Sequence, residues 1–227
     1  MKLGNRLQLI ASKIPKGLTI IDIGTDHAYL PIYLINKGIS QKVIATEINQ
    51  GPYEKAQENI KKAGLQNFIE LRQGSGFKPV KPKEGDIAVV AGMGAATIVD
   101  IIKESRHAAD SFKSLILQPM RNQAELRKYL YATGYEIIDE DVARDENKFY
   151  EVIVARKAHL AHFDEIDIIV GPVLRKKKTP VAMEYLNYRI KVLQNLIEGL
   201  KAFNSEAGRR AVLKHEKQLM ALREVVK

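Results

Sequence analysis

Ile-Ile-Asp-Ile-Gly-Thr-Asp-His-Ala occupies residues 20–28 of this chain of 227 residues. Its apolar start is typical of a buried strand, and Gly24 then predicts a turn that opens a helix. Such a strand–turn–helix unit brings backbone N–H groups close to a nucleotide-like ligand. The second glycine of a dinucleotide fingerprint is missing, and Asp26 stands there instead. Because its carboxylate would oppose a pyrophosphate, the turn favours a ligand with an adenosine and no phosphate, S-adenosyl-L-methionine.

Strand and helix patterns alternate from this stretch onward. Apolar or β-branched runs of strand length occur at Thr19–Ile23, Lys42–Ile48, Phe68–Arg72, Ile87–Ala91 and Leu115–Gln118. Helical patterns lie between them, and Pro52–Ala63 and Ala124–Ala132 are two examples. This alternation predicts a parallel sheet with helices on both faces.

Two further strands are predicted at Tyr135–Val142 and Phe149–Arg156, with a polar loop over residues 143–148 between them. The short connection predicts a hairpin, so the last strand runs antiparallel to its neighbour. Five parallel strands followed by a terminal hairpin form the sheet of Rossmann-like class I methyltransferases. We therefore predict an α/β fold of that class over residues 1–160, as a catalytic domain that binds S-adenosyl-L-methionine.

Residues 161–227 are expected to form a helical, basic, tRNA-binding appendage. A spacing of three and four residues recurs along two segments there. It predicts an antiparallel helical hairpin of coiled-coil type, with Asn204 and Ser205 between the helices. The expected seam residues are Ala182, Leu186, Arg189, Leu193, Leu196, Leu200 and Phe203, then Val212, His215, Leu219, Leu222 and Val226. Because a hairpin satisfies its own apolar seam, a monomer is favoured.

Charge and composition narrow the function. The chain has 36 basic and 27 acidic residues, a formal net charge of +9, and the part from Lys157 onward holds 14 of the basic and 8 of the acidic ones. A polyanion is the natural partner of that basic excess. The chain has no cysteine, which excludes disulfides, cysteine-ligated zinc and thiol catalysis. Without a signal peptide, an apolar run of membrane length or a metal-ligand cluster, we expect a cytoplasmic protein with no membrane partner and no metal.

The carboxyl ends of the predicted strands carry the candidate cofactor-binding residues, because ligands bind at that edge of open α/β sheets. Glu47 ends the second strand, where an acid bonds ribose hydroxyls, and Ile48 is expected against the adenine ring. Glycines at the ends of the third and fourth strands allow close approach of the backbone to a ligand. The candidates are Asp22, Gly24, Thr25, His27, Glu47, Ile48, Gly74, Ser75, Ala91, Gly92 and Met93.

Four segments together resemble the bacterial TrmK family, namely Asp22–Pro31, Ala91–Gly94, Leu115–Pro119 and Lys148–Glu151. Members of that family are S-adenosyl-L-methionine-dependent tRNA methyltransferases that act on N1 of the adenine at position 22. The resemblance covers nearly the whole chain and implies the same reaction here. Ser75 stands where the family tends to carry aspartate.

That reaction mainly requires the nucleophile to be placed in line with the methyl group. N1 of adenine has a free lone pair, and the methylated base is cationic, so a nearby carboxylate stabilises it. Asp26 is the candidate for this catalytic carboxylate. Tyr29 and Gln118 are the candidates for stacking on the base and for holding it.

The target base must also be turned out of the folded tRNA, and phosphate contacts offset the cost. The candidate RNA-binding residues are Arg175, Lys176, Lys177, Lys178, Arg209 and Arg210. Two alternatives stay open, a methyltransferase with the same cofactor and another substrate, and a non-catalytic RNA-binding module. Calorimetry with the methyl donor distinguishes the module, and methyl transfer to unmodified tRNA distinguishes the other methyltransferase.

Overall fold

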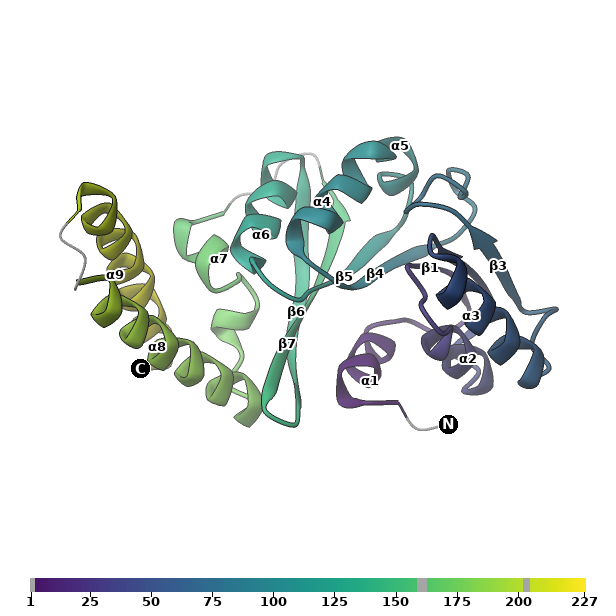
Figure 1. Ribbon diagram of the computed structural model, residues 1–227, viewed down its shortest axis with the longest axis horizontal. Coiled ribbons are helices and arrows are strands. Elements are labelled where there is room, and N and C mark those ends of the chain that lie inside the picture. The colour runs from purple at the N-terminus through teal and green to yellow at the C-terminus, as the bar shows by residue number, and fades with distance from the viewer. Residues whose placement is uncertain (1–2, 159–162, 202–204) are drawn as a thin grey trace. The chain divides into compact units, whose positions relative to one another are not determined.

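The computed structural model describes residues 3–158, 163–201 and 205–227 (Figure 1). The chain divides into two compact units, Met1–Ala161 and His162–Lys227. The predicted domain boundary, between residues 160 and 161, lies outside the described residues.

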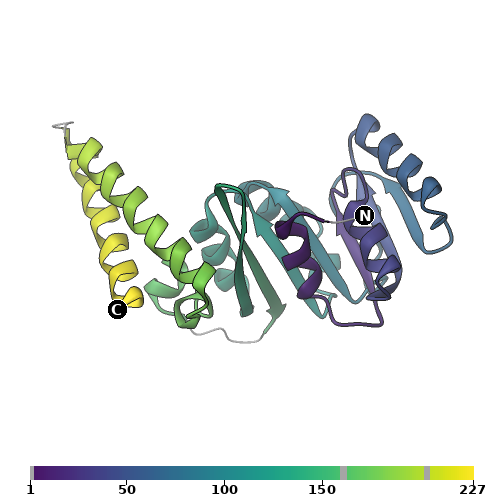
Figure 2. The same ribbon diagram turned by 90° about the horizontal axis from the view of Figure 1, so that it is seen from below.

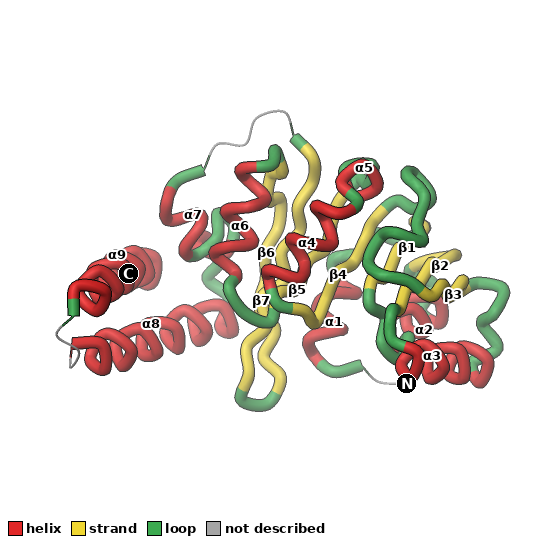
Figure 3. Tube along the Cα trace, turned by 45° about the horizontal axis from the view of Figure 1, so that its top comes forward, coloured by secondary structure: helices red, strands yellow, loops and turns green. Residues whose placement is uncertain are grey.

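In the described part of the first unit, seven strands form one sheet in the order β3-β2-β1-β4-β5-β7-β6 (Figure 3). The strands are β1 Leu18–Ile23, β2 Ser40–Glu47, β3 Ile69–Gln73, β4 Ile87–Met93, β5 Ser114–Pro119, β6 Tyr135–Asp145 and β7 Lys148–Lys157. Strands β1 to β5 pair in parallel, whereas β7 is antiparallel to both β5 and β6. The predicted methyltransferase sheet with its terminal hairpin is confirmed.

The predicted six-residue loop of the hairpin is wrong. β6 continues to Asp145 and β7 begins at Lys148, so only Glu146 and Asn147 connect them. Glu146 has a φ of 53°, the left-handed conformation that two-residue hairpin turns use. Ladder hydrogen bonds do not depend on side-chain polarity, and the polar character of residues 143–148 therefore concealed the ends of the strands.

Helices cover both faces of the sheet (Figures 1 and 3). One face carries α1 Asn5–Ser12, α2 Tyr29–Asn36 and α3 Gln50–Lys62, and the other carries α4 Ala95–Glu104, α5 Arg106–Ala109 and α6 Gln123–Ala132. The core under the first group includes Ile10 of α1, Leu34 of α2 and Ile60 of α3, all at most 3% exposed. Burial of such aliphatic side chains supplies most of the folding free energy, at roughly 25 cal/mol per Å² of apolar surface.

The turn after β1 is longer than predicted. α2 begins only at Tyr29, and Gly24–Ala28 forms a loop in which Asp26 and Ala28 both have positive φ angles. Pro31 lacks a backbone N–H and is tolerated in the first helical turn but not deeper in a helix, which fits a helix that begins at Tyr29. The residues of this loop therefore do not belong to α2, and they lie next to the carboxyl end of β1.

The second unit contains α7 Glu165–Ile169, a 3-10 helix Leu174–Lys176, α8 Pro180–Lys201 and α9 Glu206–Val226. Helices α8 and α9 lie side by side (Figure 2). The Ser205 side chain caps α9 by accepting a hydrogen bond from the Gly208 N–H at 3.0 Å. The buried residues of this unit include Ile169, Val170, Leu186, Leu193, Ile197, Leu219 and Leu222.

Part of the predicted seam of α8 is wrong. Ile197 is buried in the hairpin, whereas Leu196 is 42% exposed. Ile190 packs against the same cluster, one residue after the predicted Arg189. A straight helix has 3.6 residues per turn, so its apolar stripe drifts away from a strict alternation of three and four. The predicted positions Phe203 and Asn204 lie outside the described residues.

Candidate active site

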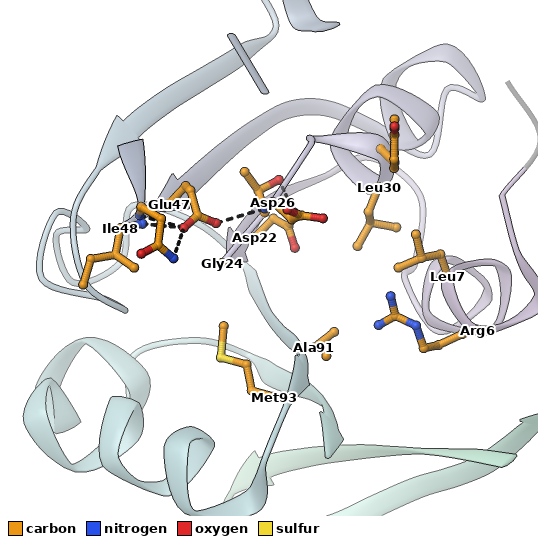
Figure 4. Close-up of a pocket in the computed structure, with 14 residues that line it drawn as sticks. Arg6, Leu7, Asp22, Gly24, Asp26, Leu30, Glu47, Ile48, Ala91 and Met93 are labelled. Carbon is orange, nitrogen blue, oxygen red and sulfur yellow. Dashed lines mark hydrogen bonds between the residues drawn. The ribbon is translucent and has the colours of Figure 1, made fainter. Parts of the chain in front are cut away.

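The carboxyl ends of β1, β2 and β4 surround a cavity of about 350 Å³ (Figure 4). β1 lies between β2 and β4, and this central position is where open α/β sheets bind ligands. Ten of the candidate residues line the cavity, namely Asp22, Gly24, Thr25, Asp26, Tyr29, Glu47, Ile48, Ala91, Gly92 and Met93. Arg6, Leu7, Leu30 and Asn49 also line it.

Gly24 lets the β1 loop fold tightly over the strand ends. Its φ is +69°, and the N–H groups of Gly24 and Thr25 both donate to the Thr46 carbonyl at 2.9 Å. A Cβ atom at position 24 would collide with the Cε of Met93, which reaches across from β4. The backbone conformation therefore favours glycine here, and a larger residue would in addition make the flexible end of the Met93 side chain move aside.

Asp22 is a buried carboxylate at the base of the cavity. It is 5% exposed and accepts a hydrogen bond from the Thr25 hydroxyl at 2.6 Å. Burial raises the pKa of Asp22 to about 6, although the Thr25 hydrogen bond and the charge of Arg6 oppose that rise. Because burial makes the ionised form of Asp22 unfavourable, a positively charged ligand group beside it would stabilise that form.

Glu47 connects the loop after β1 with the loop after β2. Its Oε1 accepts from the backbone N–H groups of Ile48 and Asn49 at 2.9 Å, and its Oε2 accepts from the Asp26 N–H at 3.1 Å. A carboxylate oxygen has about two acceptor sites, so Oε2 keeps one available for a ligand hydroxyl. Ile48, 57% exposed, presents an apolar surface beside it.

Asp26 and Tyr29 lie at the cavity with exposed side chains. The Asp26 side chain is 67% exposed, and Tyr29 is 41% exposed as a residue. His27 does not line the cavity. Its ring meets Tyr29 edge-on at 5.5 Å between centroids, and its Nε2 lies 3.5 Å from Oδ1 of Asp26. His27 therefore contacts both of the exposed side chains that line the cavity.

The loop after β3 lies outside the cavity. Neither Gly74 nor Ser75 lines it, although the Gly74 N–H donates to the Glu47 carbonyl at 2.9 Å. This hydrogen bond fixes the loop against the end of β2.

Gln118 is fully buried and does not line the cavity. Its Oε1 accepts from Nη1 of Arg6 at 3.0 Å and from the Gly92 N–H at 3.1 Å. Its Nε2 donates to the Pro119 carbonyl at 3.1 Å. The amide is thus engaged inside the protein, and Gln118 reaches the cavity only through Arg6 and Gly92.

The cavity is predominantly acidic. Asp22, Asp26 and Glu47 bring carboxylates to it, against the guanidinium of Arg6. Such a surface attracts a cation and repels phosphate groups. The described residues include no group of three or more histidine, cysteine or acidic side chains arranged to hold a metal ion. A sulfonium nucleoside fits these features.

Comparison with known proteins shows which family this sequence matches. The family model TrmK, tRNA (adenine(22)-N(1))-methyltransferase, matches residues 20–221. The chain belongs to the TrmK family. It is 34% identical over 232 residues to the tRNA (adenine(22)-N(1))-methyltransferase of Bacillus subtilis (strain 168), with 100% of this chain and 98% of the relative covered. The membership of the TrmK family that the four sequence segments indicated is confirmed.

Two solved structures support the same assignment. The B. subtilis M1A22 tRNA methyltransferase TrmK has a TM-score of 0.88 and 32% identity to this TrmK-family chain, covering 100% of this chain and 99% of its own. Streptococcus pneumoniae Sp1610, solved in complex with S-adenosyl-L-methionine, has a TM-score of 0.88 and 29% identity, with 100% of both chains covered.

Sequence reasoning missed the contribution of α1 to this TrmK-family site. Arg6 and Leu7 approach the cavity from a helix that precedes β1 by several residues. The available signal was a short helix with apolar residues on one face, followed directly by the first strand. Leu30 and Asn49 were also missed, although each adjoins a predicted residue.

The predicted RNA-binding residues belong to the second unit and differ in their surroundings. Arg175 is ion-paired with Asp167 at 3.1 Å and lies 3.6 Å from Asp164. Arg210 is ion-paired with Glu206, and Lys178 donates to the Val225 carbonyl at 2.7 Å. Lys177 is half-buried. Lys176 and Arg209 are exposed and have no ion pair among the residues that the structure describes.

None of the helices in the described residues is both long and apolar enough to cross a membrane.

Proposed function

We propose that this chain transfers a methyl group from S-adenosyl-L-methionine to N1 of the adenine at position 22 of tRNA. The observation that carries the proposal is the acidic cavity at the carboxyl ends of β1, β2 and β4. Membership of the TrmK family supplies the substrate and the position of the target base.

The cavity offers a group for each end of the methyl donor. Glu47, whose Oε2 accepts from the Asp26 N–H, would hold the ribose hydroxyls, and Ile48, which lines the cavity, would pack on the adenine. Gly24 and Gly92, both with positive φ, let the backbone approach the ligand closely. When bound, the donor supplies an electrophilic methyl group on a sulfonium centre, which Asp22 favours electrostatically.

The target adenine enters past Asp26 and Tyr29. Tyr29 stacks on the base and fixes the direction from which N1 approaches the methyl group. N1 would attack the methyl carbon with its own lone pair while the bond from that carbon to sulfur breaks and leaves its electron pair on sulfur, so no residue has to remove a proton first. Asp26 stabilises the positive charge that develops on the adenine ring. His27 orients both side chains through its contacts with them.

The second unit binds the tRNA backbone in this proposal. Lys176 and Arg209 supply the first phosphate contacts because their side chains are exposed. These contacts offset the cost of turning the base out of its stack. We further propose that the protein acts as a monomer in the cytoplasm, where its tRNA substrate is found.

Mass spectrometry of nucleosides tests the proposed reaction. Unmodified tRNA incubated with the protein and the donor should gain one 1-methyladenosine, and a transcript with guanine at position 22 should gain none. Methylation at another nucleoside would overturn the substrate assignment. Donor binding without transfer to any tRNA would favour the non-catalytic RNA-binding module.

A further inference from the structure

Met120 and Arg121 follow directly after the carboxyl end of β5, and both have exposed side chains outside the cavity. Every residue of β5 itself is buried, whereas Met120 is 47% exposed. The guanidinium of Arg121 has neither a hydrogen bond nor an ion pair among the residues that the structure describes. An apolar and a cationic side chain therefore stand together here, and we name this pair the β5 rim.

Hydrogen bonds hold the β5 rim against the end of β4. The Met120 N–H donates to the carbonyl of Met93, a residue that lines the cavity, at 2.8 Å. The Arg121 carbonyl accepts from the Ala95 N–H at 3.3 Å. Nε2 of the buried Gln118 donates to the Met120 sulfur at 3.6 Å. The β5 rim is thus fixed beside the cavity before any ligand arrives.

The Arg121 side chain lies over Gly94, the residue that precedes α4. Its Nε is 3.4 Å and its Nη2 is 3.9 Å from the position that a Cβ atom would take at Gly94. Since the neighbouring end of β4 lines the cavity, the guanidinium is turned towards the cavity side of the β5 rim. Arg121 therefore offers a cation just outside the cavity.

The cavity and the β5 rim carry opposite charge. Asp22, Asp26 and Glu47 make the cavity acidic, so a nucleotide phosphate is repelled from it. The strand order β2-β1-β4-β5 places the β5 rim on the side of the cavity opposite to Glu47. A nucleotide whose base faces the donor from that side keeps its phosphate outside the cavity, where Arg121 lies.

We propose that the β5 rim contacts the target nucleotide of the tRNA, with Met120 packed on the adenine and Arg121 paired with a phosphate beside it. This inference rests on the proposed function, because it takes a tRNA adenosine as the second substrate. A polarisable thioether makes favourable contacts with an aromatic ring. The planar guanidinium forms two parallel hydrogen bonds with a phosphate. Met120 then approaches the base from the β5 side, whereas Tyr29 approaches it from the β1 side.

Steady-state methylation of unmodified tRNA tests the two contacts separately. Arg121→Gln should raise the KM for tRNA about 5- to 10-fold and leave kcat unchanged, because a phosphate contact is equally strong before and during the reaction. It should also reduce the slope of log affinity against log salt by about one. Met120→Ala should instead lower kcat about 3- to 10-fold, because the base loses a surface that orients N1. Neither variant should change the calorimetric affinity for the donor, since neither residue lines the cavity.

Conservative variants distinguish a substrate contact from a structural role. Arg121→Lys keeps the charge and should recover most of the affinity for tRNA, and Met120→Leu keeps the apolar surface and should recover most of kcat. Lys128→Gln is the matched control, because it removes one exposed positive charge from α6, the helix after the β5 rim, at a side chain outside the cavity. It should leave KM, kcat and the salt dependence unchanged.

A measurement on the wild-type protein makes the test independent of how the variants fold. A neutral methylphosphonate linkage on one side of nucleotide 22 should weaken tRNA binding about 5- to 10-fold. The same linkage should change the affinity of Arg121→Gln by less than about 2-fold, because that variant has already lost the contact.

Three outcomes overturn the assignment. An unchanged wild-type affinity for tRNA with the neutral linkage on either side of nucleotide 22, or an equal loss in Arg121→Gln, removes Arg121 from that phosphate. A loss of donor affinity that matches the loss of kcat in Met120→Ala shows that Met120 supports the cavity and not the base. A wild-type protein that methylates no tRNA overturns the proposed function and this inference with it, whereas variants that match an active wild-type protein overturn this inference alone.

Discussion

Met93 of β4 packs over Gly24 of the β1 loop, so that its Cε lies where a side chain at position 24 would begin. This contact joins the ends of two neighbouring parallel strands and shapes the floor of the cavity. The site depends on glycine at position 24 because of its φ of +69°, whereas the end of the Met93 side chain is flexible and can move away from a Cβ there.

Gly24→Ala should lower the free energy of unfolding by about 1–2 kcal/mol and weaken donor binding, because the new methyl group strains the backbone and displaces Met93. Urea titration measures the stability. Adding Met93→Ala to Gly24→Ala should recover only the part of the lost free energy of unfolding that comes from the contact between the new methyl group and Met93. Gly51→Ala is the control, since Gly51 lies in α3 with nothing within 4 Å of a Cβ there, and it should be neutral or slightly stabilising. Fully additive effects of the Gly24 and Met93 substitutions would contradict the contact.

Asp22→Asn should stabilise the ligand-free protein at neutral pH. Burial raises the pKa of Asp22 from 3.8 to about 6, so the folded protein bears a cost whenever this carboxylate is ionised. That cost is complete above pH 6 and disappears as the pH falls towards 3.8. We expect a gain of about 1–3 kcal/mol at pH 7.5 that shrinks below pH 6, measured by urea titration at several pH values. A gain independent of pH would exclude this cause.

The same Asp22→Asn variant should bind the donor less tightly, since an amide cannot neutralise an ammonium or a sulfonium. Calorimetry at pH 7.5 should show a loss of roughly 10-fold or more. Donor affinity of the wild-type protein should fall between pH 7.5 and pH 5.5 as Asp22 takes up a proton, while that of Asp22→Asn should stay flat. A parallel fall in both proteins would point to another titrating group.

Asp26→Asn should slow methyl transfer with little change in donor affinity. Its carboxylate is two-thirds exposed, and solvent screens its charge, so we expect a modest loss of about 10-fold in single-turnover rate at saturating donor. Rapid-quench assays with labelled donor measure it. Glu54→Gln removes an acid from the exposed surface of α3 outside the cavity and serves as the control. An unchanged rate would remove Asp26 from the mechanism.

Charge reversal in the second unit should separate RNA-binding residues from structural ones. Lys176→Glu and Arg209→Glu should each weaken tRNA binding and reduce the salt dependence of the affinity by about one counterion. Arg175→Gln should instead lower the thermal stability, because it leaves the buried Asp167 without its ion pair. Filter binding across salt concentrations and thermal denaturation distinguish the two effects. An unchanged salt dependence in both Glu variants would place the tRNA elsewhere.

Arg127 of α6 should be the most sensitive charged residue of the fold. It is fully buried, with Nε 2.7 Å from Glu140 of β6 and Nη2 bonded to Glu151 of β7. Arg127→Met should cost about 3–5 kcal/mol, because two buried carboxylates lose their cation. Replacing both glutamates by leucine in that background should recover much of the loss in urea titrations. No recovery would show that packing, and not charge, is responsible.

The sequence predicted the local parts of this protein well. The strand cores, the parallel direction of the first five strands and the terminal hairpin follow from apolar runs and their spacing, which are properties of neighbouring residues. Gly24, Glu47 and Gly92 could be predicted at one cavity because the carboxyl ends of parallel strands meet at one edge. The register of α8 could not, since Leu196 and Ile197 are both apolar and only the packing of α9 selects between them.

Sequence alone thus determined the class of fold, the acidic character of the nucleoside site and the basic excess of the last third of the chain. Only the tertiary structure decided which side chains share a cavity. Arg6 and Gln118 are 112 positions apart and meet because α1 packs against the far end of the sheet. His27 and Ser75 belong to promising motifs, yet neither of them lines the cavity. The physical reason is that burial of apolar faces fixes the positions of helices and loops, and no local pattern encodes where two distant elements come into contact.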